Sequence, residues 1–210
     1  MQATSTMVYI VDDDAGVRDA LNALLTSTGR RVVTCASAGD YLRAPKPDRP
    51  SCLILDVGLP DTCGIDLQWR LGIEEHPPII FLTGNGDVRT SVRAIKAGAV
   101  DFLTKPCPNA DLLAAIDTAI AQDCRARAER TERAGLRQRY SCLTPREREV
   151  LPLVVGGLLN KQAAAKLGIS ETTLQIHRSR LMRKMQAESV AHLVRMAAAL
   201  AVPLPQRAPH

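Results

Sequence analysis

The chain has 210 residues, 46% of them hydrophobic, which is enough for packed cores in one large or two small domains and excludes a disordered chain. Its formal net charge of +5 divides unevenly: residues 1–123 hold 11 Lys/Arg and 16 Asp/Glu (−5), and residues 124–210 hold 16 and 6 (+10). No apolar run approaches the roughly 18 residues of a membrane span, residues 1–7 lack a basic signal-peptide start, and the six cysteines form no CxxC pair. We therefore expect a cytoplasmic protein without a membrane partner, a zinc site or a disulfide framework.

Short apolar runs alternate with helical patterns through the first half of the chain. Runs rich in Val, Ile and Leu predict strands at 8–11, 32–35, 52–55, 79–82 and 102–104. Apolar residues at helical spacing predict helices at 14–27, 38–43, 64–71, 88–97 and from 109 onward, the first with Gly29 as its C-cap. Right-handed crossovers leave few other arrangements of such units. The predicted fold is an α/β doubly wound, five-stranded parallel sheet of the flavodoxin-like kind.

Four of the expected strands end on polar or charged side chains. Asp12 and Asp13 follow the first strand, Asp56 the third, Thr83 the fourth and Lys105 the fifth. The carboxyl ends of parallel strands lie at one edge of the sheet, where open α/β folds place their sites. An acid pair, a lone Asp, a hydroxyl and an ammonium should therefore converge. Each residue alone could be a helix cap or chance, but the ordered set is a much rarer pattern.

These residue types suit phosphorylation of an aspartate. Asp12, Asp13 and Asp56 offer the oxygen ligands that Mg²⁺ prefers, and the backbone carbonyl of Gly58 could add another. With its charge neutralised by that metal, Asp56 would act as the nucleophile and become an aspartyl phosphate. Two further strand-end groups would bind phosphoryl oxygens, the Lys105 ammonium and the Thr83 hydroxyl.

The strand-end motifs resemble those of the receiver domains of bacterial two-component systems. The matching residues span about 7–123 and are Val-Asp-Asp-Asp at 11–14, Leu-Asp at 55–56, Leu-Thr-Gly at 82–84 and Leu-Thr-Lys-Pro at 103–106. The resemblance implies that a sensor histidine kinase transfers a phosphoryl group to Asp56. It also implies a switch in which Thr83 moves toward the phosphoryl group and Phe102 turns inward, and a cis bond before Pro106.

An Ala-, Arg- and Glu-rich stretch at 121–139 predicts that the fifth helix continues as a helical linker. After it, Thr144, Pro145 and Glu147 form a strong helix start. Helical patterns at 161–167 and 170–185, separated by Gly168, then predict a helix-turn-helix. The expected organisation is a first domain at 1–123, a linker at 124–140, a small all-α helix-turn-helix domain at 141–201 and a disordered tail at 202–210.

Helical spacing divides 170–185 into two faces. Leu174, Leu181 and Met185 form an apolar stripe for the core. The opposite face has the composition of a major-groove reader: Thr172, Gln175, Ile176, Ser179 and Arg183. Candidates for phosphate contacts are Lys161, Lys166, Arg178, Arg180 and Lys184. The net charge of +10 in this half favours double-stranded DNA as a partner over a merely solvated polar face.

Residues 141–200 resemble the LuxR-type helix-turn-helix of NarL/FixJ-family regulators. The matching motifs are Leu-Thr-Pro-Arg-Glu-Arg-Glu-Val-Leu at 143–151, Asn-Lys-Gln-Ala-Ala at 160–164, Leu-Gly-Ile-Ser at 167–170 and Thr-Leu-Gln-Ile-His-Arg at 173–178. The resemblance implies a homodimer of the phosphorylated protein on a palindromic operator, with RNA polymerase as a further partner. The dimer contact would lie on the last helix, through Val190, Leu193, Val194 and Ala197.

The sequence thus predicts a transcriptional regulator switched by phosphorylation of Asp56, and not an enzyme. Two alternatives stay open. A DNA-binding protein with a vestigial receiver would bind DNA independently of phosphorylation. A haloacid-dehalogenase-like phosphatase would also use Asp, Thr and Lys around Mg²⁺, but it would need its nucleophile in the first acidic cluster and an acidic pair beyond Lys105, where Cys-Pro-Asn follows.

Overall fold

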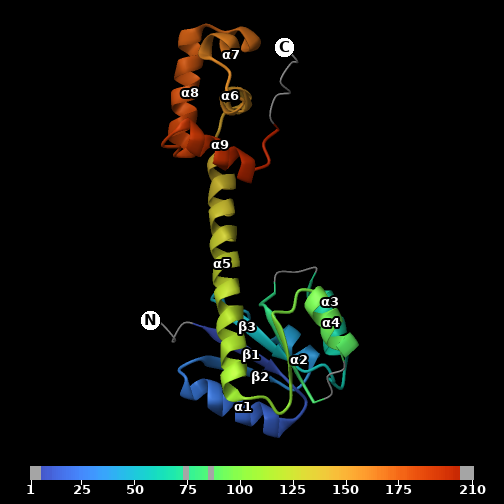
Figure 1. Cartoon of the computed structure of the whole chain (residues 1–210). Helices are drawn as coiled ribbons and strands as arrows, with labels where there is room; N and C mark the ends of the chain where they lie inside the picture. The colour runs from blue at the N-terminus through green and yellow to red at the C-terminus, as the bar shows by residue number, and fades with distance from the viewer. Residues whose placement is uncertain (1–5, 73–75, 85–87, 204–210) are drawn as a thin grey trace. The chain divides into compact units, whose positions relative to one another are not determined.

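The computed structural model describes residues 6–72, 76–84 and 88–203. The chain divides into two compact units, residues 1–127 and 128–210, which we describe separately (Figure 1). The domain boundaries expected at 123 and 141 stay predictions. Of the expected tail, Val202 packs against the core of the second unit, and residues 204–210 lie outside the described residues.

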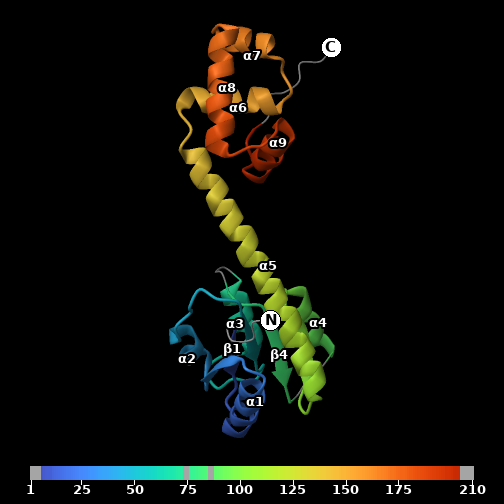
Figure 2. The same cartoon turned by 90° about the vertical axis from the view of Figure 1, so that its left-hand side faces the viewer.

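The first unit is a five-stranded parallel sheet in the order β2-β1-β3-β4-β5, as predicted for a doubly wound fold (Figures 1 and 2). Its strands are β1 (Met7–Val11), β2 (Arg31–Cys35), β3 (Ser51–Leu55), β4 (Ile79–Thr83) and β5 (Asp101–Thr104). Its helices are α1 (Ala15–Ser27), α2 (Ala38–Arg43), α3 (Gly64–Leu71), α4 (Val88–Lys96) and α5 (Asn109–Ser141), the last of which ends in the second unit.

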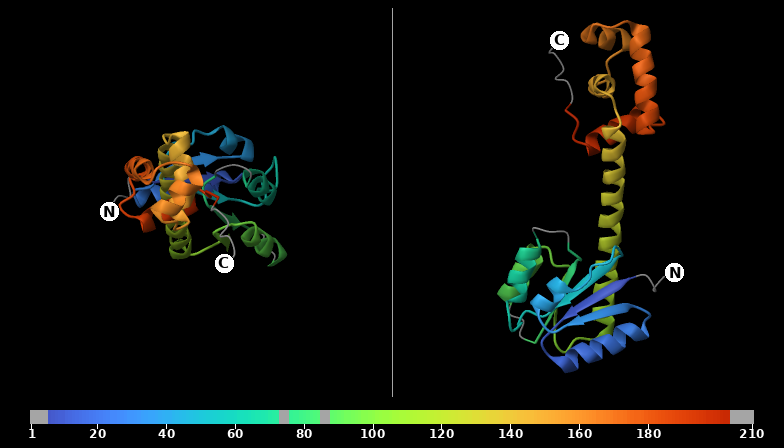
Figure 3. Two further views of the ribbon diagram at one scale, coloured as in Figure 1. Left: turned by 90° about the horizontal axis from the view of Figure 1, so that it is seen from above. Right: turned by 180° about the vertical axis from the view of Figure 1, so that it is seen from behind.

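Helices cover both faces of the sheet. Successive strand residues point to opposite faces, and apolar residues on each face pack against the helices there. In β1, Tyr9 and Val11 belong to a core shared with α2, α3 and α4, whereas Val8 and Ile10 belong to a core shared with α1 and α5. Figure 3 shows the sheet between these two groups of helices. All five residues of β3 are buried, so the strand that leads to Asp56 is held rigidly from both sides.

Helix α1 begins directly after Asp14, which caps it. The Asp14 carboxylate accepts hydrogen bonds from the backbone N–H groups of Gly16 and Val17, which satisfies donors that the first helical turn leaves unpaired. The end differs slightly from the prediction: the C-cap is Thr28, and Gly29 follows it with φ 79°. The left-handed residue therefore stands one position after the cap, where glycine is favoured because it has no Cβ.

The second unit packs four helices against the end of α5. They are α6 (Pro145–Val155), α7 (Asn160–Leu167), α8 (Glu171–Met185) and α9 (Val190–Ala199). The predicted helix start is confirmed, since Thr144 and Glu147 form a capping box with Pro at the first turn. Gly168 ends α7 in the left-handed conformation, and Ser170 caps α8. The predicted helix-turn-helix is therefore present.

The core of the second unit includes the apolar stripe predicted for α8. Leu174, Leu181 and Met185 are fully buried together with Leu136 of α5 and residues of α6, α7 and α9. The end of the expected linker therefore contributes to this core. Within the described ranges, no helix has the length and apolarity needed to cross a bilayer.

A buried ion pair joins α6 to α8. The Glu147 side chain is 2% exposed, and its Oε2 accepts a hydrogen bond of 2.7 Å from Lys184 Nζ. Lys184 Nζ also donates to the backbone carbonyl of Cys142 at 3.2 Å. Burial raises the pKa of Glu147, but the hydrogen bonds from Lys184 and Thr144 outweigh it and leave this pKa below its ordinary value of 4.5.

Substitution Lys184→Met should destabilise the second unit by about 2 kcal/mol, because it leaves the Glu147 carboxylate buried without its cation. Calorimetric unfolding of the full chain would measure the loss, with exposed Lys166→Met as a control expected to change stability by less than about 0.5 kcal/mol. Because the pKa of Glu147 is lowered in the folded protein, the difference between wild type and Lys184→Met should be full above pH 4.5 and shrink as the pH falls below it. Equal stability of the two Met variants would contradict this account.

Candidate functional site

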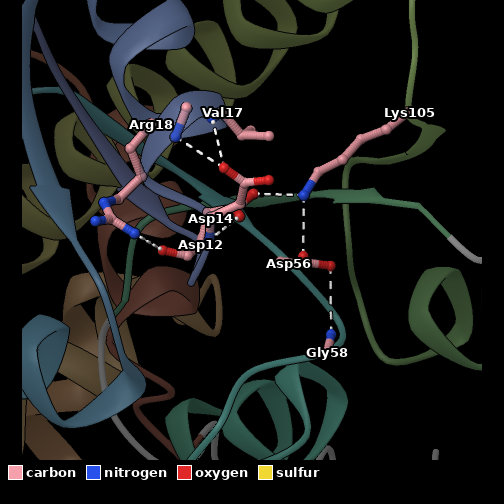
Figure 4. A network of polar contacts seen from close by, with 8 residues as sticks. Asp12, Asp14, Val17, Arg18, Asp56, Gly58 and Lys105 are labelled. Atoms are coloured by element: carbon pink, nitrogen blue, oxygen red, sulfur yellow. Dashed lines mark hydrogen bonds and ion pairs between the residues drawn. The ribbon is translucent and has the colours of Figure 1, made fainter.

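One lysine joins two of the strand-end aspartates at the carboxyl edge of the sheet (Figure 4). Lys105 Nζ lies 2.5 Å from Asp12 Oδ2 and 2.9 Å from Asp56 Oδ2. Both carboxylates are nearly buried, with side chains 3% and 11% exposed, and the Lys105 side chain is 21% exposed. The predicted convergence of residues 93 and 49 positions apart in the chain therefore occurs.

The ammonium in this pair is strongly stabilised. Burial lowers the pKa of Lys105, but the hydrogen bonds and charges of Asp12 and Asp56 outweigh burial and raise this pKa above its ordinary value. Lys105 is therefore charged at all physiological pH values and supplies a fixed positive charge beside Asp56.

Two residues that the sequence analysis did not assign to the site hold Asp12 in place. The Asp14 backbone N–H donates to Asp12 Oδ1 at 3.0 Å, so both Asp12 oxygens have partners. The Arg18 guanidinium of α1 donates to the Asp12 backbone carbonyl at 2.7 Å (Figure 4). The sequence could have indicated the role of Asp14, because an Asp before a helix is a typical N-cap. An Arg on the first turn of a helix, such as Arg18, has no local pattern that would indicate its contact with Asp12.

Asp13 completes a cluster of acids at the site. Carboxylate oxygens of Asp12, Asp13 and Asp56 all lie within 4.8 Å of one another, with Asp13 exposed and the other two buried. Three carboxylates and the Lys105 ammonium leave a net charge of −2 in this small volume. Such a charge with oxygen ligands, open to solvent on the Asp13 side, fits a hard divalent cation that keeps several of its waters.

The loop after Asp56 places Gly58 and Gly64 close to the phosphoacceptor candidate. The Gly58 backbone N–H donates to Asp56 Oδ1 at 3.3 Å. A Cβ on Gly64 would lie 2.2 Å from the Asp56 backbone oxygen, so only glycine permits α3 to begin this close to β3. Gly58 was expected from the sequence as a metal ligand, whereas no local pattern marked Gly64.

Thr83 lies on β4, which pairs with β3, and Phe102 lies on β5, the edge strand beyond β4. Thr83, the last residue of β4, is 4% exposed, and its carbonyl accepts a hydrogen bond of 2.8 Å from the Lys105 N–H. Phe102 of β5 is partly buried against the core, with its ring centroid 5.9 Å from that of Phe81. The peptide bond between Lys105 and Pro106 is cis, as the resemblance implied.

The outer face of α8 is open to solvent in the second unit. Its five predicted base-reading residues are all exposed: Thr172, Gln175, Ile176, Ser179 and Arg183. Among the predicted phosphate contacts, Lys161, Lys166 and Arg180 are exposed. Arg178 donates to Asn160 Oδ1 at 2.7 Å and so joins α8 to α7, but an arginine has five donors and others remain for a phosphate.

Lys184 needs a correction. It was expected to contact phosphate, but its ammonium lies between the buried Glu147 carboxylate and the carbonyl of Cys142. Moving it to DNA would leave the buried carboxylate without a cation, which costs more than one phosphate contact contributes. Lys184 is therefore not among the DNA contacts that we propose.

The expected dimer contact on α9 also needs a correction. Leu193 and Ala197 are 0% and 1% exposed within a single chain, so they stabilise the unit itself and offer no surface to a partner. Val190 packs partly against the same core, and Val194 is 38% exposed. The apolar stripe that suggested the contact is the buried face of α9, since helices of a small bundle use that face for their own core.

Two family models match the chain, one for each unit. Residues 8–117 match the response regulator receiver domain, and residues 141–197 match the bacterial regulatory proteins of the luxR family. Neither family is a catalytic one. Receiver domains bind Mg²⁺ at an acidic pocket, and this chain has the matching cluster of aspartates. This domain pair implies a phosphodonor kinase and DNA as partners.

Relatives match this chain along more than nine-tenths of its length. Nodulation protein W of Bradyrhizobium diazoefficiens is 44% identical over 201 residues, which cover 95% of this chain and 88% of that protein. Transcriptional regulatory protein FixJ of the same organism is 40% identical over 195 residues, covering 92% of this chain and 95% of FixJ. The solved structure of response regulator StyR is similar with a TM-score of 0.83 and 41% identity, over 92% of this chain and 98% of that one. The chain belongs to the response regulators of two-component systems, in the NarL/FixJ family, and is a transcription regulator with a receiver domain and a LuxR-type DNA-binding domain.

Proposed function

We propose that Asp56 accepts a phosphoryl group from a sensor histidine kinase and that this modification controls DNA binding by the second unit. The observation that carries the proposal is the Lys105 ammonium, which lies 2.9 Å from Asp56 Oδ2 and also pairs with Asp12. A carboxylate attacks a phosphoryl group poorly unless nearby cations neutralise the charges that both carry, and Lys105 supplies one cation at the reacting oxygens.

The reaction is a phosphoryl transfer between two side chains. An Asp56 carboxylate oxygen attacks the phosphorus of a phosphohistidine, the new O–P bond forms as the P–N bond breaks, and the imidazole nitrogen keeps the electron pair and takes a proton from solvent. The Lys105 ammonium would then pair with a phosphoryl oxygen in place of a carboxylate oxygen of Asp56. The Thr83 hydroxyl would donate a hydrogen bond to a second phosphoryl oxygen. Because Asp56 stands at the end of a fully buried strand, the transfer requires no movement of the nucleophile's backbone.

The metal site and the switch belong to the same proposal. Asp12, Asp13 and Asp56, with the carbonyl of Gly58, would hold Mg²⁺, which supplies the positive charge that the attacking and transferred oxygens need. After transfer, Thr83 would move toward the phosphoryl group and Phe102 would turn into the space that it leaves. The partial burial of Phe102 beside the tightly packed Phe81 supports a second ring position.

In the second unit, α8 would enter the major groove. Gln175 suits an adenine edge, Ile176 a thymine methyl and Arg183 a guanine or a phosphate. The exposed Thr172 and Ser179 complete the reading face, and the flanking phosphates would be bound by Lys161, Lys166, Arg178 and Arg180. The exposure of the five reading residues and of Lys161, Lys166 and Arg180 supports this assignment.

The remaining partners are those expected of a transcription regulator. We expect the phosphorylated protein to act in the cytoplasm as a homodimer on a palindromic operator, where it would influence RNA polymerase. On α9, Val194 is the one residue of the four originally expected that offers a clearly exposed apolar contact. The functional division into a receiver at 1–123, a linker at 124–140 and a DNA-binding domain at 141–201 is part of this proposal.

Substitution Asp56→Asn should abolish phosphorylation, because an amide is not a nucleophile toward phosphorus. Incubation with Mg²⁺ and acetyl phosphate, followed by intact-protein mass measurement, would detect the added phosphoryl group. DNA binding and sedimentation in the same samples should change with phosphodonor in wild type and not in Asp56→Asn. The control Asp66→Asn removes one exposed acid from α3 and should behave as wild type. Wild type and Asp56→Asn with the same DNA binding in every sample would establish a vestigial receiver.

Two substitutions should separate base reading from phosphate binding. Gln175→Ala should cost about 1–3 kcal/mol on the preferred site and relax specificity at one base pair. Lys161→Ala should weaken binding to all sequences alike and reduce the slope of log affinity against log salt by about 1. Operators selected from a randomised DNA library, measured over a range of salt concentrations, would show both effects. A uniform loss for Gln175→Ala would remove it from the reading face.

A further inference from the structure

The loop between β3 and α3, residues 56–64, is closed at its base. The Gly64 N–H donates to the Val57 carbonyl at 2.9 Å, and Gly58 and Cys63 pair as an isolated antiparallel bridge. These contacts hold the two arms of the loop together. They leave the tip, which starts at Pro60, to be held by something outside the loop.

The tip is bound to the first turn of α2 by Asp61. Its Oδ1 accepts from the Ala38 N–H at 3.2 Å and its Oδ2 from the Gly39 N–H at 2.9 Å. These are donors that the start of a helix leaves without partners. The helix's own cap, Ser37, satisfies a different one, the N–H of Asp40, at 3.1 Å. The first turn of α2 is therefore capped by two side chains, one of which comes from the loop after the phosphoacceptor.

Helix α2 is itself fixed to the sheet. Its residues Ala38 and Tyr41 are buried, and the Tyr41 ring packs edge-on against Tyr9 of β1 with centroids 5.5 Å apart. The hydrogen bond from Gly39 lowers the pKa of Asp61 below its ordinary value, so the carboxylate is charged at neutral pH. Asp61 thus connects the loop to a rigid element through a charged pair of hydrogen bonds.

We propose that Asp61 is a positioning residue for the phosphoryl-transfer site, because it holds the loop tip on α2 and thereby fixes the backbone of Gly58 beside Asp56. The proposal rests on the function proposed above. Gly58 donates its N–H to the Asp56 carboxylate at 3.3 Å and pairs with Cys63 on the other arm of the loop, and Asp61, two residues before Cys63, holds that arm on α2. Mg²⁺ demands near-ideal octahedral geometry, so a loop released at its tip would present the Gly58 carbonyl less accurately and bind Mg²⁺ more weakly.

Mg²⁺ binding to the full chain, measured by isothermal titration calorimetry, tests the proposal. Asp61→Ala should weaken Mg²⁺ binding about tenfold, the lower end of what loss of a group that orients a metal ligand costs. Ser37→Ala is the matched control, since it removes the other side-chain cap of α2 without touching the loop, and it should leave Mg²⁺ binding unchanged. Asp61→Asn keeps one acceptor oxygen for two N–H donors, so it should recover part of the affinity. Thermal unfolding of each variant would show the contribution of each cap to stability.

Two results would overturn the role of Asp61. They are unchanged Mg²⁺ binding in Asp61→Ala and an equal loss of Mg²⁺ binding in Ser37→Ala. Acetyl phosphate added to the same samples separates this inference from the function on which it rests. A wild-type protein that binds Mg²⁺ but gains no phosphoryl group would refute the proposed function, while the calorimetric comparison would still decide the role of Asp61. A wild-type protein that binds no Mg²⁺ would overturn both.

Discussion

Three carboxylates and one ammonium lie close together at the carboxyl edge of the sheet. The balance of their charges determines how the side chains of this site are arranged. Lys105 pairs with Asp12 and Asp56 at 2.5 and 2.9 Å, which offsets one negative charge and leaves two, the charge that a divalent cation would neutralise. Without Lys105 the two buried carboxylates would repel each other at close range, with no cation between them. The same ion pairs that allow the acids to be buried would also supply a cation to the phosphoryl group that we propose for Asp56.

Burial of the strands makes this arrangement accurate. The sheet is covered on both faces, so β3 and β4 are buried along their whole lengths and deliver Asp56 and Thr83 to fixed positions. The loops after two of the strands are tied back to rigid elements. Arg18 of α1 holds the Asp12 carbonyl, and Asp61 joins the loop after Asp56 to α2. Rigid strands with restrained loops are the general way in which open α/β folds combine precision with chemistry.

In the second unit, residues of the same type and in similar sequence positions differ in whether they lie in the core or on the surface. Lys161 and Lys184 are both lysines on the helix-turn-helix, yet one is exposed and the other neutralises the buried Glu147. On α9, Leu193 and Val194 are adjacent, yet only Val194 reaches the surface. The set of residues that we propose to face DNA is therefore smaller than the basic composition suggests, because it leaves out a lysine that neutralises a buried carboxylate.

The sequence by itself determined the class of the protein. Strand and helix patterns, the order of Asp12, Asp13, Asp56, Thr83 and Lys105 on strand ends, and the capping signals of the second half predicted the parallel sheet and the helix-turn-helix, because these features depend on local periodicity and on a topology with few alternatives. Only the tertiary structure decided which polar and apolar groups pair at a distance. Lys184 and Glu147 are 37 positions apart, and Asp61 and Gly39 are 22 apart. Nothing local marks such pairs, since a charged side chain or an apolar stripe satisfies the same local pattern whether its partner is water, DNA or the protein's own core.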